Sequence, residues 1–235
     1  MQKIIHLADQ RGHANYGWLD TYHTFSFGSY YNTSSMGFGA LRVLNDDVLQ
    51  GGGGFGVHGH SNMEIISVPL QGALVHGDNT GHTSVIRTND VQVMSAGTGI
   101  RHTEHNYSSY EPVSFLQIWI LPEAQDLSPR YAQGSFDPKT WENQFVFLVV
   151  PKQQQGKLWI NQRAFVARAI LKVGEVVSYA LQVPGHGVYV LIIEGKASIA
   201  RELLSRRDGM GIKGADRLVF QGIETCDVLL IEVPM

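Results

Sequence analysis

The sequence has a single cysteine, few charged residues and no long apolar run, and each shortage excludes a class of protein. Cys226 has no second cysteine with which to form an internal disulfide, so the fold must rest on its hydrophobic core. No stretch approaches the roughly 18 consecutive apolar residues typical of a membrane span. The first residues, Met1-Gln2-Lys3, lead into a short apolar run rather than the apolar segment of a signal peptide. We therefore expect a cytoplasmic protein without a membrane span.

Positive charge is also scarce. Lysine and arginine total 18 against 21 aspartates and glutamates, which gives a formal net charge of −3. Direct binding to nucleic acid needs many cationic side chains against the phosphates, so nucleic acid is not an expected ligand. In contrast, 43% hydrophobic residues in a chain of 235 can supply a sizeable core for one large or two modest domains.

Glycine is abundant, with 26 residues spread between short runs of β-branched and aromatic residues. This pattern predicts an all-β fold of many strands joined by tight turns. The strands expected in the first half are residues 39–49, 55–60, 64–70, 73–77, 84–88, 91–95, 102–107 and 113–121. Proline and polar residues between Leu121 and Pro129 predict a linker with a short helix. A second strand-rich stretch is expected from about Phe145.

The two halves resemble diverged copies of one unit. Residues 63–72 align with residues 187–195 when Gly72 is matched to Gly195, and Asp90 aligns with Asp216. The second-half residues that correspond to His58, His60, His102 and Glu104 are then Leu181, Val183, Val228 and Leu230. The second half is therefore expected to keep the strands and to lack the polar side chains at these positions.

Two pairs of potential metal ligands stand out, because in each pair the ligands are two positions apart. They are His58-Gly59-His60 and His102-Thr103-Glu104. Residues i and i+2 of a strand project to the same face. Two such strands facing each other inside a barrel would offer three imidazoles and one carboxylate, a set suited to Fe(II), Mn(II), Ni(II), Cu(II) or Zn(II). A lone histidine is usually an ordinary polar residue, but the paired spacing and the glycine-dense residues 51–56 and 97–99 favour a metal site.

These residues belong to sequence blocks that resemble a known family. The spacing from His58 and His60 to Glu64 resembles the first motif of cupins. The more particular resemblance is to the pirin family, including the bacterial pirin-like quercetin 2,3-dioxygenases. It rests on RGHANYGWLD at residues 11–20, HTFSF at 23–27, LRVLNDD at 41–47, HGHSNME at 58–64, SAGTGIRH at 95–102 and QIW at 117–119.

The resemblance implies two cupin domains, each a small antiparallel β-barrel of the double-stranded β-helix (jelly-roll) type. They are expected at residues 1–125, with the metal, and 126–235, without metal ligands. Carried over residue by residue, His58, His60, His102 and Glu104 are the implied ligands, and Glu104 is also the candidate catalytic base. In many cupins outside pirins the glutamate of the first motif is a ligand. Glu64 is here expected to orient an imidazole instead.

The implied activity is that of a metal-dependent dioxygenase that opens the ring of a flavonol such as quercetin with dioxygen. One divalent transition metal would be the cofactor, Fe(II) first, with Mn, Ni, Cu and Zn as alternatives. The substrate would be a small planar phenol. A different class of function is a non-enzymatic, iron-dependent redox sensor or transcriptional cofactor that acts through protein partners. A third is a metal that mainly braces the barrel.

Other residues carry weaker expectations. His13 and His23 would each line a pocket or simply cap a strand end. His105 should point away from the face that carries Glu104. His76 and His82 flank a turn-rich stretch typical of a hairpin tip and are expected to be solvated. Cys226 is expected to be a buried, inert thiol in a strand.

Overall fold

The protein is built almost entirely of strands. The structure is a computed structural model that describes residues 1–152 and 158–235. Within these ranges the helical segments are two short 3₁₀ turns, η1 (Ala8–Gln10) and η2 (Pro138–Trp141). None of the helices in the described part of the chain is long and apolar enough to cross a membrane. The all-β expectation is confirmed.

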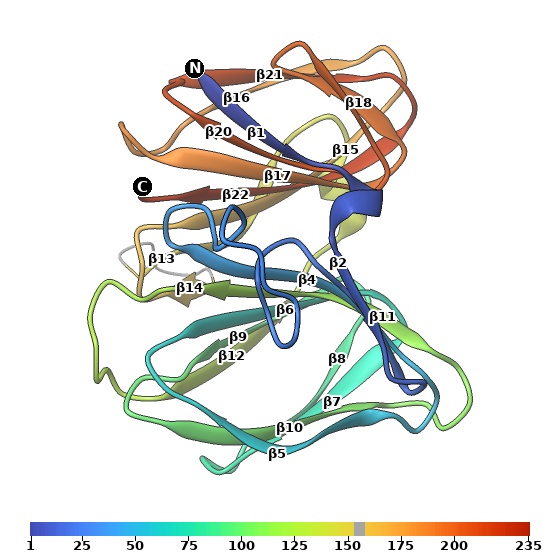
Figure 1. Cartoon of the computed structure of the whole chain (residues 1–235), viewed down its shortest axis with the longest axis vertical. Helices are drawn as coiled ribbons and strands as arrows, with labels where there is room; N and C mark the ends of the chain where they lie inside the picture. The colour runs from blue at the N-terminus through green and yellow to red at the C-terminus, as the bar shows by residue number, and fades with distance from the viewer. Residues whose placement is uncertain (153–157) are drawn as a thin grey trace.

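The strands form two barrels, each made of a larger and a smaller sheet (Figure 1). The larger sheet of the N-terminal barrel has the order β12 (Arg130–Ser135), β9 (Asp90–Ser95), β6 (Glu64–Gln71), β11 (Val113–Ile120), β4 (Leu41–Leu49), β3 (Leu19–His23) and β2 (Gly12–Asn15). Its smaller sheet has the order β5 (Gly54–His60), β10 (Ile100–Asn106), β7 (Ala73–Asp78) and β8 (Thr83–Arg87).

The C-terminal barrel repeats this arrangement. Its larger sheet has the order β1 (Gln2–His6), β20 (Gly209–Lys213), β17 (Gly187–Glu194), β22 (Cys226–Val233), β15 (Phe165–Leu171), β13 (Val146–Pro151) and β14 (Trp159–Ile160). Its smaller sheet has the order β16 (Val176–Ala180), β21 (Arg217–Gly222), β18 (Lys196–Ile199) and β19 (Glu202–Ser205). Figure 1 shows the two larger sheets facing each other, with the smaller sheets at the two ends of the molecule.

The strands expected from the sequence lie within two residues of the observed ones, but the expected helix between residues 121 and 129 is absent. Backbone groups of this segment bond to distant parts of the chain instead of to each other. The Leu121 N–H donates to Ala40 O, and Leu127 O accepts from the Thr98 N–H. These long-range bonds use groups that a helix would have paired locally.

Each barrel contains one strand from the other half of the chain. Strand β1 pairs with β20 of the C-terminal barrel, and β12 pairs with β9 of the N-terminal barrel. The division expected after residue 125 remains a prediction, and these two exchanged strands tie the barrels together across it.

Strand order and register show how the two halves correspond. The order β5-β10-β7-β8 matches β16-β21-β18-β19. The pairing registers show which positions of the two barrels are equivalent. Those of His58, His60, His102 and Glu104 correspond to Tyr179, Leu181, Leu218 and Phe220. The alignment of Asp90 with Asp216 was therefore wrong, because Asp90 begins β9 whereas Asp216 lies in the turn before β21. The inference drawn from it survives, since none of the four counterparts is an imidazole or a carboxylate.

Alternation along the strands decides what fills each barrel. On β11, Leu116, Ile118 and Ile120 pack in the core between the two larger sheets, whereas Gln117 and Trp119 face the interior of the N-terminal barrel. The interior of the C-terminal barrel is filled by a continuous apolar cluster. The N-terminal barrel holds only two small clusters. A cavity of about 360 Å³ occupies the remaining space.

Candidate metal centre

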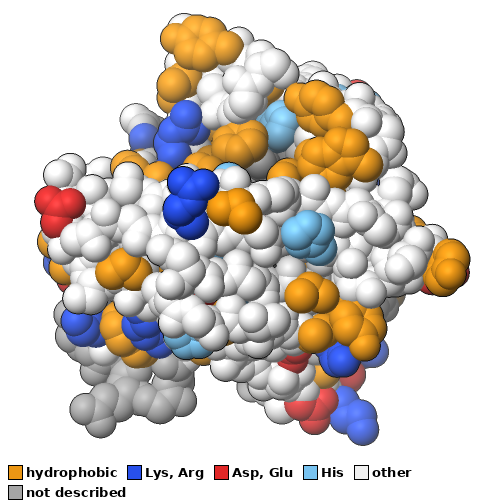
Figure 2. Space-filling model, turned by 90° about the horizontal axis from the view of Figure 1, so that it is seen from below, with side chains coloured by type: hydrophobic (Ala, Val, Ile, Leu, Met, Phe, Trp, Pro, Cys, Tyr) orange, Lys and Arg blue, Asp and Glu red, His pale blue; other side chains and the backbone are white. Residues whose placement is uncertain are grey.

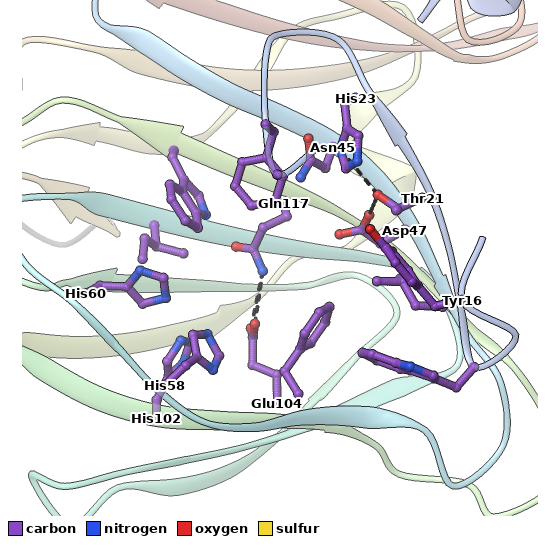
Figure 3. A pocket seen from close by; sticks show the side chains of 17 residues that line it. Tyr16, Thr21, His23, Asn45, Asp47, His58, His60, His102, Glu104 and Gln117 are labelled. Carbon is purple, nitrogen blue, oxygen red and sulfur yellow. Dashed lines mark hydrogen bonds between the residues drawn. The ribbon is translucent and has the colours of Figure 1, made fainter. Parts of the chain in front are cut away.

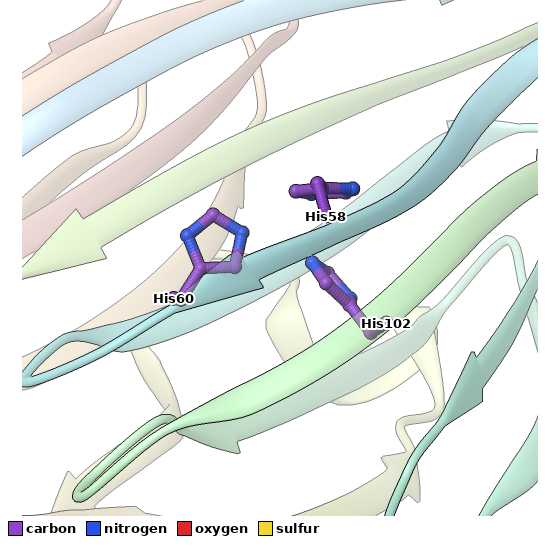
Figure 4. A group of neighbouring side chains, drawn as sticks. All are labelled: His58, His60 and His102. Atoms are coloured by element: carbon purple, nitrogen blue, oxygen red, sulfur yellow. The ribbon is translucent and has the colours of Figure 1, made fainter.

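Three histidines meet on two neighbouring strands of the smaller N-terminal sheet. His58 and His60 lie on β5, and His102 lies on β10 directly opposite His58. Their potential ligand atoms all lie within 4.8 Å of one another (Figure 4). The two-residue spacing therefore places these side chains on one face, as expected. The strands are hydrogen-bonded neighbours, however, and do not face each other across the barrel.

Glu104 follows His102 on the same face, beyond a bulge in the pairing of β10 with β5. Its carboxylate lies within 4.8 Å of a nitrogen of His102 in a second cluster, which also contains His76. Gln117 Nε2 donates to the two carboxylate oxygens at 3.1 and 3.4 Å (Figure 3), and Ser67 Oγ donates at 3.2 Å. These two donors hold the buried carboxylate in place.

The hydrogen bonds of the imidazoles fit the binding of a divalent metal. The Nδ1 of His58 lies 2.8 Å from Gly56 O. A carbonyl can only accept, so Nδ1 carries the proton and Nε2 keeps its lone pair. The Nε2 of His102 is buried and has no hydrogen-bond partner. Such an unpaired buried atom is costly unless a ligand satisfies it, and a cation would do so.

Burial sets the charge of this cluster. It lowers the pKa of His102 to about 3 and that of His60 to about 4, and the neighbouring His58 lowers both further. These imidazoles are therefore neutral near pH 7, which is the form that binds metal. Burial raises the pKa of Glu104, while the neighbouring His76 and the Gln117 hydrogen bond oppose the rise. A bound cation would further favour the carboxylate.

The histidines lie at one side of the cavity in the N-terminal barrel. Aromatic side chains line much of it: Trp18, Phe27, Phe55 and Trp119. Its opposite wall is polar and comes from β3 and β4, where Thr21 pairs with Asp47 and His23 with Asn45 (Figure 3). Figure 2 shows the molecule from below, where histidine and hydrophobic side chains reach the surface among charged ones. The cavity suits a largely apolar ligand with polar groups at its ends.

Asp47 is the second buried carboxyl group of the cavity. The Thr21 hydroxyl donates a short hydrogen bond to it. Burial raises the pKa of Asp47 to about 7, and the nearby charges of Asp46 and Glu104 add to the rise while the Thr21 bond opposes it. The group therefore changes charge near neutral pH, inside the pocket.

Two sequence expectations about the surroundings of the site were wrong. Glu64 does not orient an imidazole. It sits on the face of β6 turned away from the cavity, where Ser95 Oγ donates to it at 2.6 Å and Asn161 Nδ2 at 3.1 Å. His76 is not solvated. It lies within β7, paired on both sides, and is fully buried beside His102. The turn that should have exposed it begins only after Asp78.

The remaining histidines and the cysteine are now placed. His23 lines the cavity, whereas His13 is exposed and bonds to Asp20 at 2.6 Å. His105 is exposed on the face opposite Glu104, as predicted. His82 is half exposed and Cys226 is buried in β22, also as predicted.

Sequence reasoning missed the polar wall and the donors to Glu104. Asn45 and Asp47 lie two residues apart in β4, between the apolar residues at its two ends, and Gln117 lies between leucine and isoleucine in β11. Polar residues on one face of a core strand are a signal of a lined cavity, because a buried polar side chain is costly unless it has a partner. Ser67 carried no such signal, since serine is common in strands of every kind.

Comparison with known proteins identifies the family to which the chain is similar. A family model described as pirin matches residues 5–120, and one described as quercetinase C-terminal cupin domain matches residues 147–233. A quercetin 2,3-dioxygenase of Escherichia coli K12 is 38% identical over 227 residues, which are 97% of this chain and 96% of the relative. A pirin-like protein of Caulobacter vibrioides is 38% identical over 225 residues, 95% of this chain and 96% of its own length.

A solved structure agrees with these sequence matches. The crystal structure of the bacterial pirin YhhW from Escherichia coli, in complex with nickel(II), has a TM-score of 0.93 and 37% identity, and the match covers 99% of both chains. Identity at this level along nearly the whole chain, with the same two-barrel fold, is decisive. The chain belongs to the pirin family.

Proposed function

We propose that the protein is a metal-dependent dioxygenase that opens the ring of a flavonol such as quercetin. One divalent metal would be held by His58, His60, His102 and Glu104. The observation that carries the proposal is the position of the partly buried donor cluster at the side of a cavity of about 360 Å³ lined by aromatic residues. A planar phenol matches such a cavity in shape and polarity. The names of the relatives support the same reaction.

The metal, with Fe(II) as the first expectation and Mn, Ni, Cu or Zn as alternatives, would supply Lewis acidity that lowers the pKa of an enolic hydroxyl. The protein supplies the rest. Trp18, Phe55 and Trp119 provide flat apolar surfaces that would orient the substrate rings and exclude water. Glu104 lines the cavity beside His102 and would accept a hydroxyl proton on a carboxylate oxygen.

The supporting contacts indicate how Glu104 could serve in this way. Gln117 and Ser67 both donate to its carboxylate, so a proton that arrives there must replace or share a hydrogen bond. That arrangement holds the group in one orientation before and after proton transfer. The reaction as proposed consumes one dioxygen for each flavonol opened and releases carbon monoxide.

The test is an oxygen-electrode assay with metal-loaded protein and quercetin, combined with elemental analysis and detection of carbon monoxide. His102→Ala should lose the stoichiometric ion and dioxygen uptake together. Glu104→Gln should retain part of the metal and lose most of the uptake. His105→Ala is the matched control, because it alters an exposed histidine on the same strand. A parent protein that binds one ion yet consumes no dioxygen with any flavonol would contradict the proposal.

A further inference from the structure

His76 lies directly behind the candidate ligand His102 and uses both of its ring nitrogens there. Its Nδ1 lies 3.4 Å from the Nδ1 of His102, and its Nε2 lies 2.9 Å from Asp78 Oδ2. The ring is fully buried and stacks on Tyr131, with ring centroids 4.7 Å apart. Packing therefore fixes the plane of the His76 ring, and the contacts with Asp78 and His102 engage its two nitrogens.

Asp78 is held as an acceptor at the far end of this chain of contacts. The side chain of Asp78 is fully buried. Its Oδ1 accepts from the Thr80 N–H at 2.8 Å, from the Thr80 hydroxyl at 2.6 Å and from the His82 N–H at 3.3 Å. Burial alone would raise the pKa of Asp78, but the hydrogen bonds from Thr80 and His76 outweigh it and hold the pKa at about 2. Oδ2 is left for His76.

The hydrogen bonds from Asp78 through His76 to His102 determine where the protons of this group lie. An ionised carboxylate can only accept, so the His76 Nε2 carries a proton and donates it to Asp78. For His102 to bind a cation through its buried, unpartnered Nε2, its Nδ1 must carry the proton, so the His76 Nδ1 is the acceptor of this pair. The partner that donates to it is the Nδ1–H of His102. The proton on Nδ1 leaves the His102 Nε2, which is buried and unpartnered, with its lone pair free.

We propose that Asp78 and His76 form a relay that fixes the tautomer of His102, so that its Nε2 lone pair is presented to the metal. This inference rests on the metal site of the proposed function and assigns His76 and Asp78 as positioning residues. It also assigns a role to a histidine that the two-residue pattern did not include. Partners that orient a ligand in this way typically contribute about 10–100-fold to metal affinity.

The same atoms allow a competing assignment. His76, His102 and Glu104 also lie within 4.8 Å of one another, so His76 could itself be a ligand. For that, one of its nitrogens would have to leave Asp78 or His102. The relay keeps both hydrogen bonds, and the two assignments predict different results for substitutions of His76.

The experiment uses the full chain labelled with ¹⁵N-histidine, and two-bond ¹H–¹⁵N spectra report the tautomer of each ring. In metal-free parent protein His102 should be the Nδ1–H tautomer. His76→Phe retains a ring against Tyr131 and removes the acceptor, so His102 should shift towards the Nε2–H form. The affinity for Zn(II), measured by competition with a chelator, should fall about 10–100-fold. His76→Asn places an acceptor oxygen near the Nδ1 position and should recover most of that loss.

His82→Ala is the matched control, because His82 is half exposed, approaches the same carboxylate at 3.7 Å and belongs to neither of the two clusters that contain His102. It should leave both the tautomer and the affinity unchanged. Asp78→Asn provides a second test if His76→Phe does not fold, and it should weaken Zn(II) binding in the same direction.

Two results would overturn the relay. One is a His102 tautomer and a Zn(II) affinity that are unchanged in His76→Phe. The other is loss of binding in His76→Asn as complete as in His102→Ala, which would make His76 a ligand. Failure of the proposed function looks different, because a protein that never consumes dioxygen with a flavonol could still show the tautomer and affinity changes described here.

Discussion

Replacing Asp47 by asparagine should make the stability of the metal-free protein less sensitive to pH. Burial raises the pKa of Asp47 from 3.8 to about 7 in the folded protein. Between these two values the folded state keeps the proton while the unfolded chain releases it. The unfolded state therefore binds fewer protons, and the stability of the parent falls as the pH rises. The contribution of the protonated carboxyl is complete below about pH 3.8 and lost above about pH 7.

The size of the effect follows from the shift. A change from 3.8 to about 7 is about 3 units, and each unit corresponds to about 1.4 kcal/mol, so the upper bound is about 4 kcal/mol. Asparagine has nearly the same shape, has no charge to desolvate, and its amide oxygen can accept the Thr21 hydroxyl that now bonds to Asp47. Asp47→Asn should therefore gain stability relative to the parent as the pH rises.

Urea denaturation at intervals from pH 4 to pH 8 measures this difference. The free energy of unfolding of Asp47→Asn minus that of the parent should rise by up to about 4 kcal/mol over the range. Asp9→Asn is the control, because Asp9 is exposed and should show no such trend. A difference for Asp47→Asn that stays flat from pH 4 to pH 8 would refute the reasoning, since it would mean that the folded and unfolded states titrate alike.

Three further outcomes are expected. Gln117→Leu removes the stronger donor to the site carboxylate and should weaken Zn(II) binding about 10-fold or more in a chelator competition. Gly97→Ala should lower the free energy of unfolding in urea by about 2 kcal/mol or more, because φ is +48° there and a Cβ would overlap Leu127 O. The control Gly81→Ala should cost less, because the space around Gly81 is open. Cys226 should resist a thiol reagent until the protein is unfolded, since it is 1% exposed and burial raises its pKa to about 11.

The strands and the ligand pairs were predictable because both depend on local periodicity. Short runs of β-branched and aromatic residues between glycines gave the strands from β4 to β11 to within two residues, whereas β1, β2 and β3 were not expected. The two-residue spacing placed His58 with His60, and His102 with Glu104, on one strand face each. The prediction of a short helix near Leu121 was wrong because the backbone of that segment bonds to residues far away in the sequence, which local periodicity does not reveal.

Only the tertiary structure decided which strands are neighbours and therefore what each buried side chain meets. The sequence determined that His58 and His60 share one face of a strand, and that His102 and Glu104 share one face of another, because the period of a strand is a property of the backbone. It did not determine that β7 packs between β8 and β10 and buries His76 behind His102. It also did not place Asp47 across the cavity from the histidines. Burial and pairing arise from contacts between residues distant in the chain, and no local pattern encodes them.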